Sequence, residues 1–521
     1  MATQPRRPSP TISPAQPSPD SDAVDEEIAF DRGVPGLMIP DLFTQLPPLR
    51  DTLVTATSVV QDETVEVCLP FLGGEDGAVE YNEHGVPRLD REKHIKFLHQ
   101  SLGKLPGRFV AADASRPWFL YWCLSALTML GEDVTSYQES IAETARSMQN
   151  DTGGFGGGGR QLSHMATTYA VVLSLALVGG EEAYELVDRK AMWRWLCTLK
   201  QPDGGFQVCL GGEEDIRGAY CAAVIISLLR LPLDLTPESP AYTGDDSVNL
   251  FTGVADYVRR CQTFEGGISG QPNAEAHGAY AFCALGCLAL LDHPGRSIPS
   301  YLDVPRLIAW LSSRQYAPEG GFSGRTNKLV DGCYSHWVGG CFPLIEACLN
   351  SSTTTTTTSG SRSSGGSVAA EDAAATAATT TSRTRLAPAE ESLFSREGLI
   401  RYILCCCQDQ TKRGGLRDKP EKMSDAYHSC YVLSGLSSAQ HQWELDDDND
   451  NDNDLSEPAE EADAADAAAA AEAVWAVLPY LDGLQVFDNK DRVRPIHPVY
   501  AIPQQSVRAM KEYFRERQGG F

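Results

Sequence analysis

The feature of this sequence that most constrains its fold is a glycine pair that recurs along the chain. A pair followed by an apolar residue begins at Gly153, Gly204, Gly266, Gly320 and Gly414. A glutamine stands shortly before each pair, at Gln149, Gln201, Gln262, Gln315 and Gln408, and a tyrosine follows at Tyr169, Tyr220, Tyr280, Tyr334 and Tyr427. Similarity at a period of roughly 50 residues indicates stacked units that bury their faces against their neighbours.

Each unit has the pattern of a helical hairpin. Residues 189–199 are amphipathic and precede the second glycine pair, whereas residues 219–229 follow it and are apolar nearly all round. Residues 91–130 show the same two helices, which makes six hairpins. Amphipathic helices suit an outer ring and apolar helices an inner one. We therefore predict an all-α fold, an α/α toroid with a central cavity at the N-terminal ends of the inner helices, although periodicity alone equally allows an open solenoid.

The toroid is predicted to be a single domain over residues 51–514. Residues 1–25 are rich in Pro, Ser and Asp and are expected to form a disordered tail. Residues 351–385 and 446–473 are low-complexity insertions, which we expect to be surface loops.

Composition narrows the classes of function. Acidic residues outnumber basic ones by 70 to 43, and the net charge of −27 argues against general nucleic-acid binding. No apolar run approaches the ~20 residues that span a bilayer, and the N-terminus lacks an apolar signal segment. We therefore expect a cytoplasmic protein without membrane insertion, whose 15 cysteines are reduced thiols.

Three residues form a candidate metal site. Asp331 and Cys333 offer one hard oxygen and one soft sulfur two residues apart, and His428 falls at nearly the same register of the next unit. Asp, Cys and His with an open fourth position is the pattern of a catalytic zinc site, because structural sites fill the fourth position with Cys or His. The open position would receive a substrate.

Polar and aromatic residues around this site suggest an isoprenoid diphosphate. His277, Arg325, Lys328 and Tyr334 could bind phosphate oxygens together with helix N-termini. One alternative is that such residues only cap helix N-termini, which suits Asp331 but does not explain Arg217 and His277. Another is that Arg325 and Lys328 form a solvated face. Aromatic residues recur along the inner helices and suit a long apolar ligand, although each alone could be core packing: Trp118, Trp122, Tyr169, Tyr220, Tyr280, Trp337 and Tyr431.

Five segments closely resemble the protein farnesyltransferase β-subunit family: residues 113–118, 275–280, 324–334, 418–420 and 427–431. The resemblance extends over residues 51–514 apart from the two insertions. It implies an α/α toroid that binds Zn²⁺, Mg²⁺ and farnesyl diphosphate and pairs with a prenyltransferase α subunit. The implied activity is transfer of a farnesyl group to the cysteine thiol of C-terminal CaaX motifs, in proteins such as small GTPases.

The resemblance also implies roles for individual residues. The zinc ligands would be Asp331, Cys333 and His428, with Tyr334 as a further catalytic residue, and Asp418 would hold magnesium. Farnesyl diphosphate would contact Arg217, Tyr220, His277, Gly278, Ala279, Tyr280, Cys283, Arg325, Lys328, Tyr334 and Trp337. The pocket for the peptide and for measuring chain length would comprise Trp118, Trp122, His164, Tyr427 and Tyr431. The family often has Pro where this chain has Thr167, so the preference for the last CaaX residue stays open.

Other functions fit parts of the pattern. A type I geranylgeranyltransferase β subunit is the nearest alternative. A terpene cyclase-like toroid would need an acidic initiating motif in the cavity, whereas the only Asp cluster lies in a low-complexity insertion. A non-catalytic scaffold is the third alternative, and bound zinc would count against both it and the cyclase.

Overall fold

The computed structural model describes residues 36–47, 52–75, 77, 79–355, 392–446, 474–480 and 485–517. The predicted tail lies outside this part of the chain. So do the two predicted insertions, apart from their first residues, because helix α14 runs to Thr355 and strand β1 to Asp446.

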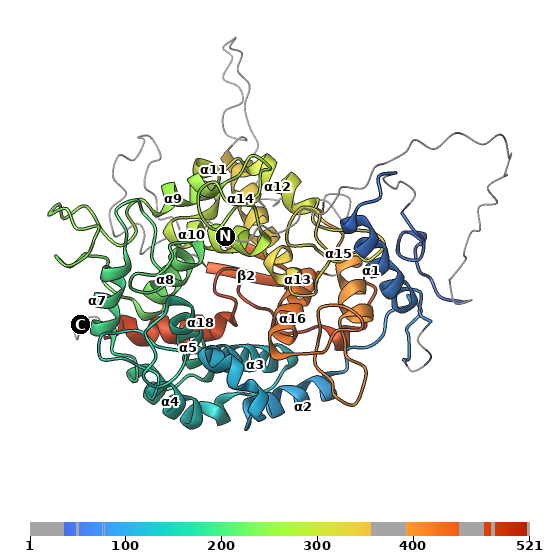
Figure 1. Ribbon diagram of the computed structural model, residues 1–521, viewed down its shortest axis with the longest axis horizontal. Helices are drawn as coiled ribbons and strands as arrows, with labels where there is room; N and C mark the ends of the chain where they lie inside the picture. Colours follow the sequence, from blue (N-terminus) through green and yellow to red (C-terminus); the bar gives the residue numbers. More distant parts are fainter. Residues whose placement is uncertain are drawn as a thin grey trace, which may run out of the picture.

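Helices arranged as an inner ring form the centre of the molecule (Figure 1). They are α3 (Arg116–Leu130), α5 (Met165–Val178), α8 (Ile216–Leu229), α10 (Gly278–Leu291), the broken helix α13 (Tyr334–Trp337), η4 (Gly339–Cys341) and α14 (Phe342–Thr355), and α16 (Ala426–Gln440). Each contacts the next in this order, and α16 packs against α3. The ring is therefore closed, which excludes the open solenoid.

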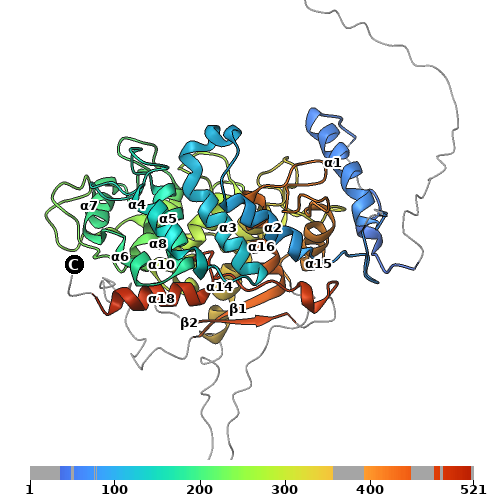
Figure 2. The ribbon, with the colours of Figure 1, turned by 90° about the horizontal axis from the view of Figure 1, so that it is seen from below.

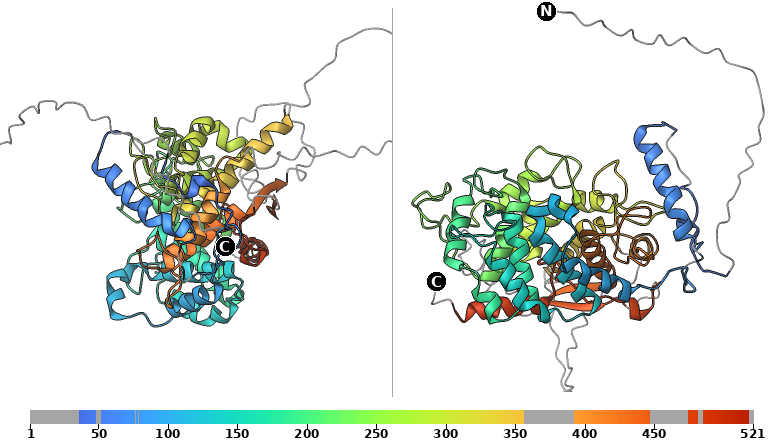
Figure 3. Two further views of the ribbon diagram at one scale, coloured as in Figure 1. Left: turned by 90° about the vertical axis from the view of Figure 1, so that its right-hand side faces the viewer. Right: turned by 60° about the horizontal axis from the view of Figure 1, so that its bottom comes forward.

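The amphipathic helices form the outer ring, as predicted. They are α2 (Arg91–Leu102), α4 (Gln138–Arg146), α7 (Arg189–Leu199), α9 (Val254–Cys261), α12 (Val304–Ser312) and α15 (Arg396–Arg401), the last continued by a π-helix, η5 (Tyr402–Cys406). The remaining short elements are η1 (Asp41–Phe43), η2 (Gly107–Ser115), η3 (Thr135–Tyr137), α6 (Glu181–Glu185), α11 (Pro294–Tyr301) and η7 (Asn489–Asp491). Helix α1 (Ala56–Leu72) contacts η5 at the outer edge of the ring (Figure 3).

The glycine pairs are the points at which neighbouring hairpins meet. A Cβ on Gly153 would lie 2.1 Å from the carbonyl oxygen of Ala191 in α7, and one on Gly154 would lie 2.9 Å from the ring of Trp195. The next outer helix presents a backbone carbonyl to the first glycine of each later pair, from Gly253, Arg306, Gly398 and Lys93. An aromatic residue four positions after that carbonyl meets the second glycine in three of these pairs, namely Trp310, Tyr402 and Phe97. Gly205 differs, because a Cβ there would meet Glu214, although Tyr257 stands at the corresponding position of α9. The last pair, Gly414 and Gly415, meets the first outer helix and so joins the two ends of the toroid.

The glutamines reinforce the same junctions. Gln149 accepts a hydrogen bond from the backbone N–H of Asp188, the N-cap residue of α7, at 3.0 Å. Gln262 and Gln315 bind the N-cap residues of α12 and α15 in the same way. Buried Gln408 accepts from Asp90, which caps α2, at 3.0 Å. Gln201 departs from the pattern and donates to Leu199 O.

The C-terminal part of the chain covers one end of the ring. Residues 493–502 contact the last turns of α3 and α16 and reach inward, where Tyr121 and Tyr220 donate to the carbonyls of Ala501 and Val499 at 3.0 and 2.7 Å. Helix α18 (Gln504–Arg515) packs on α5 and α8 along the same side (Figure 2). The N-terminal ends of the inner helices lie away from this cover.

One small sheet departs from the all-α prediction. Strand β1 (His441–Asp446) pairs antiparallel with β2 (Val474–Pro479) on the two sides of the second predicted insertion. Trp443 and Trp475 are buried against His497, and β1 also contacts α14 and α16, so the hairpin links the C-terminal segment to the ring. None of the helices in the described segments is long and apolar enough to cross a membrane.

Candidate functional site

The three predicted zinc ligands meet at the N-terminal end of the inner ring. One ligand atom from each of Asp331, Cys333 and His428 lies within 4.8 Å of the others. Asp331 and Cys333 come from the turn before α13, in which the N–H of Cys333 donates to Asp331 Oδ1 at 2.9 Å. His428 comes from the first turn of α16, which contacts α13. The sequence prediction that these residues converge is met by the geometry.

His428 is held between two carboxylates. Its Nδ1 lies 2.7 Å from Asp425 Oδ2, and its Nε2 lies 3.2 Å from Asp331 Oδ1. Burial lowers the pKa of His428, but the contacts with Asp331 and Asp425 outweigh burial and raise it to about 12. Nε2 is buried and makes no hydrogen bond of normal geometry. An imidazole fixed by a carboxylate on one nitrogen, with the other directed at a carboxylate and a thiol, is the arrangement of a metal ligand.

The donor set fits zinc. Burial raises the pKa of the Cys333 thiol to about 12 against the opposing effect of His428, so the thiol is protonated near neutral pH when no metal ion binds it. A divalent ion would favour the thiolate instead. One carboxylate, one thiol and one imidazole leave the fourth position of a tetrahedral zinc ion open.

His277 and Tyr334 lie beside this group. His277 caps α10 by accepting from the N–H of Ala279 at 3.1 Å, and its Nε2 lies 3.2 Å from the Tyr334 hydroxyl. Burial, with a smaller contribution from Arg325, lowers the pKa of His277 to about 4. The ring is therefore a neutral hydrogen-bonding group near pH 7. Capping and a place at the site are not exclusive, since His277 does both.

The predicted cations come from different turns at this end of the ring. Arg325 pairs with Glu275 at 2.7 Å, and Arg217 pairs with Asp215 and lies over the ring of Tyr280 at 5.8 Å. Lys328 is exposed, and within the described residues no ion pair is seen for it. The first two cations are thus oriented by carboxylates, while Lys328 extends into solvent.

The other predicted ligand contacts lie on the inner helices. Gly278 opens α10 and packs so closely that a Cβ there would lie 2.5 Å from Val338. Cys283 lies deeper and is buried. The hydroxyl of Tyr220 already donates to Val499 O, so this residue offers a ligand its ring rather than its hydroxyl.

Aromatic side chains form a continuous wall from α3 to α16 and α13. The ring centroids of Trp118 and Trp122 are 5.6 Å apart, those of Trp122 and Tyr427 are 5.3 Å apart, and those of Tyr427 and Tyr431 are 4.9 Å apart. Trp337 lies 4.5 Å from Tyr431 and donates its indole N–H to the Tyr427 hydroxyl at 3.1 Å. We call these five residues the aromatic wall. Asp331, Cys333 and His428 are together called the metal group. Because Tyr427 precedes His428, the aromatic wall begins at the metal group.

His164 and Thr167 lie at the start of α5. His164 caps the helix through Nδ1, which accepts from Ala166 N at 3.1 Å, and its ring is half-buried. Thr167 is buried, and its hydroxyl donates to the carbonyls of Phe155 and His164 at 2.7 and 3.0 Å. Thr167 therefore ties the glycine-pair turn to α5.

Asp418 is not a solvated loop carboxylate. It is partly buried, and its side chain pairs with Lys419 at 2.6 Å. Burial and the neighbouring charge of Asp331 raise the pKa of Asp418. Its backbone carbonyl accepts from the N–H of Gly332, which stands between two of the metal ligands.

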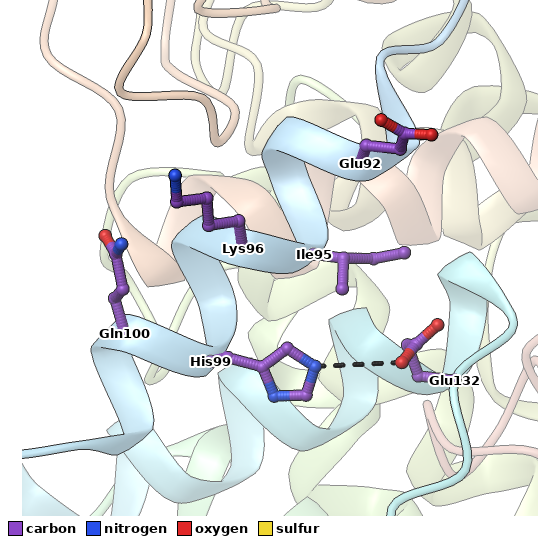
Figure 4. Close-up of a pocket in the computed structure, with 6 residues that line it drawn as sticks. All are labelled: Glu92, Ile95, Lys96, His99, Gln100 and Glu132. Carbon is purple, nitrogen blue, oxygen red and sulfur yellow. Dashed lines mark ion pairs between the residues drawn. The ribbon is translucent and has the colours of Figure 1, made fainter.

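Sequence reasoning missed Asp425. The available signal was an aspartate at a helix N-terminus three residues before a histidine, which is the spacing of an N-cap that can also reach the imidazole. A recess beside α2 and the turn after α3 is lined by Glu92, Ile95, Lys96, His99, Gln100 and Glu132 (Figure 4). It contains none of the predicted site residues.

Comparisons with known proteins identify the family. The prenyltransferase alpha-alpha toroid domain matches residues 89–502. The chain is 58% identical to the protein farnesyltransferase subunit beta of Pyricularia oryzae, over 97% of this chain and 91% of that protein. It is 37% identical to the Schizosaccharomyces pombe protein of the same description, over 75% of this chain and 86% of that one.

Geranylgeranyl transferases are more distant. The type-1 subunit beta of Arabidopsis thaliana is 25% identical, over 68% of this chain and 86% of its own length. Among solved structures, the Candida albicans protein geranylgeranyltransferase-I complexed with GGPP matches with a TM-score of 0.54 and 20% identity, covering 82% of this chain and 99% of that chain. This likeness supports the toroid fold alone. From the family match and the identity to its relatives, the chain belongs to the protein farnesyltransferase β subunits of the prenyltransferase α/α toroid family.

Proposed function

We propose that the chain is the β subunit of a zinc-dependent, heterodimeric protein farnesyltransferase. The enzyme would transfer the farnesyl group of farnesyl diphosphate to the cysteine thiol of a C-terminal CaaX motif. The observation that carries this proposal is the convergence of Asp331, Cys333 and His428 beside His277 and Tyr334 at one end of the aromatic wall.

Asp331, Cys333 and His428 would hold the zinc ion. A zinc ion with an open position lowers the pKa of a thiol that binds there, so that a peptide cysteine is a thiolate at neutral pH. Asp425 keeps the His428 ring in place through Nδ1, and the N–H of Cys333 orients the Asp331 carboxylate. These contacts preorganise the ligands, which makes binding depend less on rearrangement.

The leaving diphosphate would be stabilised by groups from the neighbouring hairpins. Tyr334 and the neutral His277 supply hydrogen bonds, and Arg325, Lys328 and Arg217 supply positive charge as negative charge builds on the departing oxygens. Asp418 would share a magnesium ion with the same oxygens, because a carboxylate is a hard ligand that suits magnesium bound to phosphate. In the structure the Asp418 carboxylate forms an ion pair with Lys419.

The isoprenoid chain would lie along the aromatic wall. Trp118, Trp122, Trp337 and Tyr427 are partly exposed although they come from inner helices, so an apolar ligand can reach their rings. Burying apolar ligand surface against them yields roughly 25 cal/mol per Å².

A prenyltransferase α subunit, farnesyl diphosphate and CaaX proteins such as small GTPases would be the partners, in the cytoplasm. The Pyricularia oryzae relative is described as a subunit, which supports assembly of this chain with a second chain. All 15 cysteines are free thiols, as expected in a reducing compartment. The higher identity to farnesyltransferase subunits than to the geranylgeranyl subunit favours the farnesyl group as the donor.

The test is metal analysis of the purified two-chain enzyme together with a transfer assay. We expect about one zinc ion per β chain and farnesyl transfer to a CaaX peptide but not to its Cys→Ser form. Removing the metal with a chelator should abolish transfer, and added zinc should restore it. Undiminished transfer by the metal-free enzyme would overturn the proposal.

A further inference from the structure

One backbone oxygen, the carbonyl of Asp418, joins the metal group to the outer ring. It accepts from the N–H of Gly332 at 2.8 Å and from the Tyr402 hydroxyl at 2.9 Å. The Cys407 thiol lies 3.5 Å away as a third, weaker donor. Gly332 stands between Asp331 and Cys333, so this oxygen holds the turn that carries two of the three metal ligands.

The turn and the Asp418 segment are in direct backbone contact. A Cβ on Gly332 would lie 2.7 Å from Arg417 O and 3.1 Å from Asp418 O. No side chain fits between them, and the hydrogen bond from Gly332 sets their separation. A displacement of the Asp418 carbonyl would therefore move the backbone between the two ligands.

Tyr402 occupies a position that recurs in other outer helices. It is the aromatic residue that packs on the second glycine of the preceding pair, since a Cβ on Gly321 would lie 2.6 Å from its ring. Phe97 fills the same position against Gly415, so a phenyl ring satisfies the packing. The hydroxyl of Tyr402 is thus not needed for the junction between hairpins and is available for Asp418.

The helix that carries Tyr402 is widened at this point. Residues Tyr402–Cys406 form a π-helix, and the N–H of Cys407 lies 3.2 Å from both Tyr402 O and Ile403 O. The wider turn brings both the Tyr402 hydroxyl and the Cys407 thiol to the same carbonyl. π-helical turns are rare and occur frequently at functional sites. Tyr402 is completely buried, and burial raises its pKa well above the ordinary value, so its hydroxyl remains a donor.

We propose that Tyr402 is a positioning residue for the zinc site, which acts by fixing the Asp418 carbonyl and, through Gly332, the spacing of Asp331 and Cys333. The inference rests on the proposed zinc-dependent function. The same residue would then serve both metals, because Asp418 offers its side chain to magnesium and its carbonyl to the turn that carries two zinc ligands.

The test is the zinc affinity of Tyr402→Phe in the two-chain enzyme, measured by competition with a chelator. The phenyl ring keeps the packing on Gly321, and only the hydrogen bond is lost. Removing partners that orient metal ligands typically weakens metal binding 10- to 100-fold, and we expect about a tenfold loss. The affinity for farnesyl diphosphate should stay unchanged.

The matched control is Tyr257→Phe. Tyr257 has the same register in α9 and is also buried, and within the described residues no hydrogen bond is seen for its hydroxyl. We expect wild-type zinc affinity for this variant. The visible spectrum of the cobalt-loaded enzyme should change in Tyr402→Phe but not in Tyr257→Phe, because only the first alters the ligand geometry. The melting temperatures of the metal-free variants and wild type are compared separately, because a loss of packing would lower them even without zinc.

Wild-type zinc affinity in Tyr402→Phe would overturn the inference, as would an equal loss in Tyr257→Phe. Cys333→Ala separates this failure from failure of the proposed function. If Cys333→Ala binds zinc like the wild type, the zinc site itself is wrong. If Cys333→Ala loses zinc while Tyr402→Phe keeps full affinity, only the role of Tyr402 is refuted.

Discussion

Asp425 serves the helix and the site with one carboxylate. It accepts the backbone N–H of His428 at 2.8 Å as the cap of α16, and it contacts the imidazole Nδ1 at 2.7 Å. Because one nitrogen of His428 is engaged in this way, the other is directed at Asp331. His277 combines capping and a site position in the same manner. Helix N-termini thus explain why the polar residues of the site gather at one end of the inner ring.

Trp118 is predicted to set the length of isoprenoid that fits along the aromatic wall. Its ring stacks on Trp122 and lies 6.0 Å from Tyr169, so we expect it to fill volume that a fourth isoprene unit would need. Trp118→Thr should open this volume and raise the preference for geranylgeranyl over farnesyl by about tenfold or more, since clashes in an apolar site cost ~1–3 kcal/mol. The measurement is the ratio of kcat/KM for the two donors in wild type and variant.

A purely structural role for Trp118 predicts a different result. The variant would then lose stability without a change in donor preference. An unchanged ratio in a folded Trp118→Thr enzyme would mean that another residue limits the chain length.

Asp418 should govern the response of the enzyme to magnesium. Asp418→Lys removes the hard ligand and places a second cation beside Lys419, so added magnesium should no longer raise the transfer rate. Glu421→Lys is the matched control, because it makes the same charge change at an exposed position of the same loop. The magnesium dependence of the transfer rate checks this, and a wild-type titration curve in Asp418→Lys would refute the assignment.

At the scale of elements, the junctions between hairpins depend on backbone contact at the glycine pairs. Gly414 has a φ of +67°, and a Cβ there would lie 2.5 Å from Lys93 O. Gly211 has a similar φ of +73° but nothing within 4 Å of a Cβ. Both alanine variants suffer the backbone strain of a positive φ, but only Gly414→Ala also forces two backbones apart.

Gly414→Ala should therefore be less stable than Gly211→Ala by about 1–3 kcal/mol. Urea unfolding of the two variants measures the difference in the free energy of unfolding. Equal losses of stability in the two variants would show that the positive φ of the glycine, and not its close contact with the next hairpin, determines the effect.

The elements themselves were largely predictable. Periodicity gave the two helices of each hairpin, and the predicted helix over residues 189–199 coincides with α7. The partner of each glycine pair was not predictable, because the carbonyls it meets lie on the next hairpin. The π-helix that starts at Tyr402 was not predicted, because the repeat pattern indicates only an outer helix there. The β1–β2 hairpin was missed because its two strands are far apart in the sequence.

At the scale of the whole molecule, closure of the ring creates the site. The sixth hairpin packs against the first, which brings Tyr427 against Trp122, and against the fifth, which brings His428 to Asp331 and Cys333. The residues were named from the sequence, but a repeat pattern does not say whether the first and last units meet. The C-terminal segment covers one end of the ring, and the N-termini of the inner helices lie at the other end.

The metal group and the diphosphate-binding group are predicted to be separate sets of side chains in one site. Zinc content and farnesyl diphosphate affinity of Cys333→Ala and His428→Ala, measured on the same two-chain samples, test it most directly. We expect both variants to lose zinc and peptide farnesylation. The Kd for farnesyl diphosphate should stay within about threefold of wild type, which is a change of ~0.7 kcal/mol in binding free energy, because neither side chain belongs to the diphosphate-binding group. Zinc retained at the wild-type level, or farnesyl diphosphate binding lost together with zinc, would contradict the account.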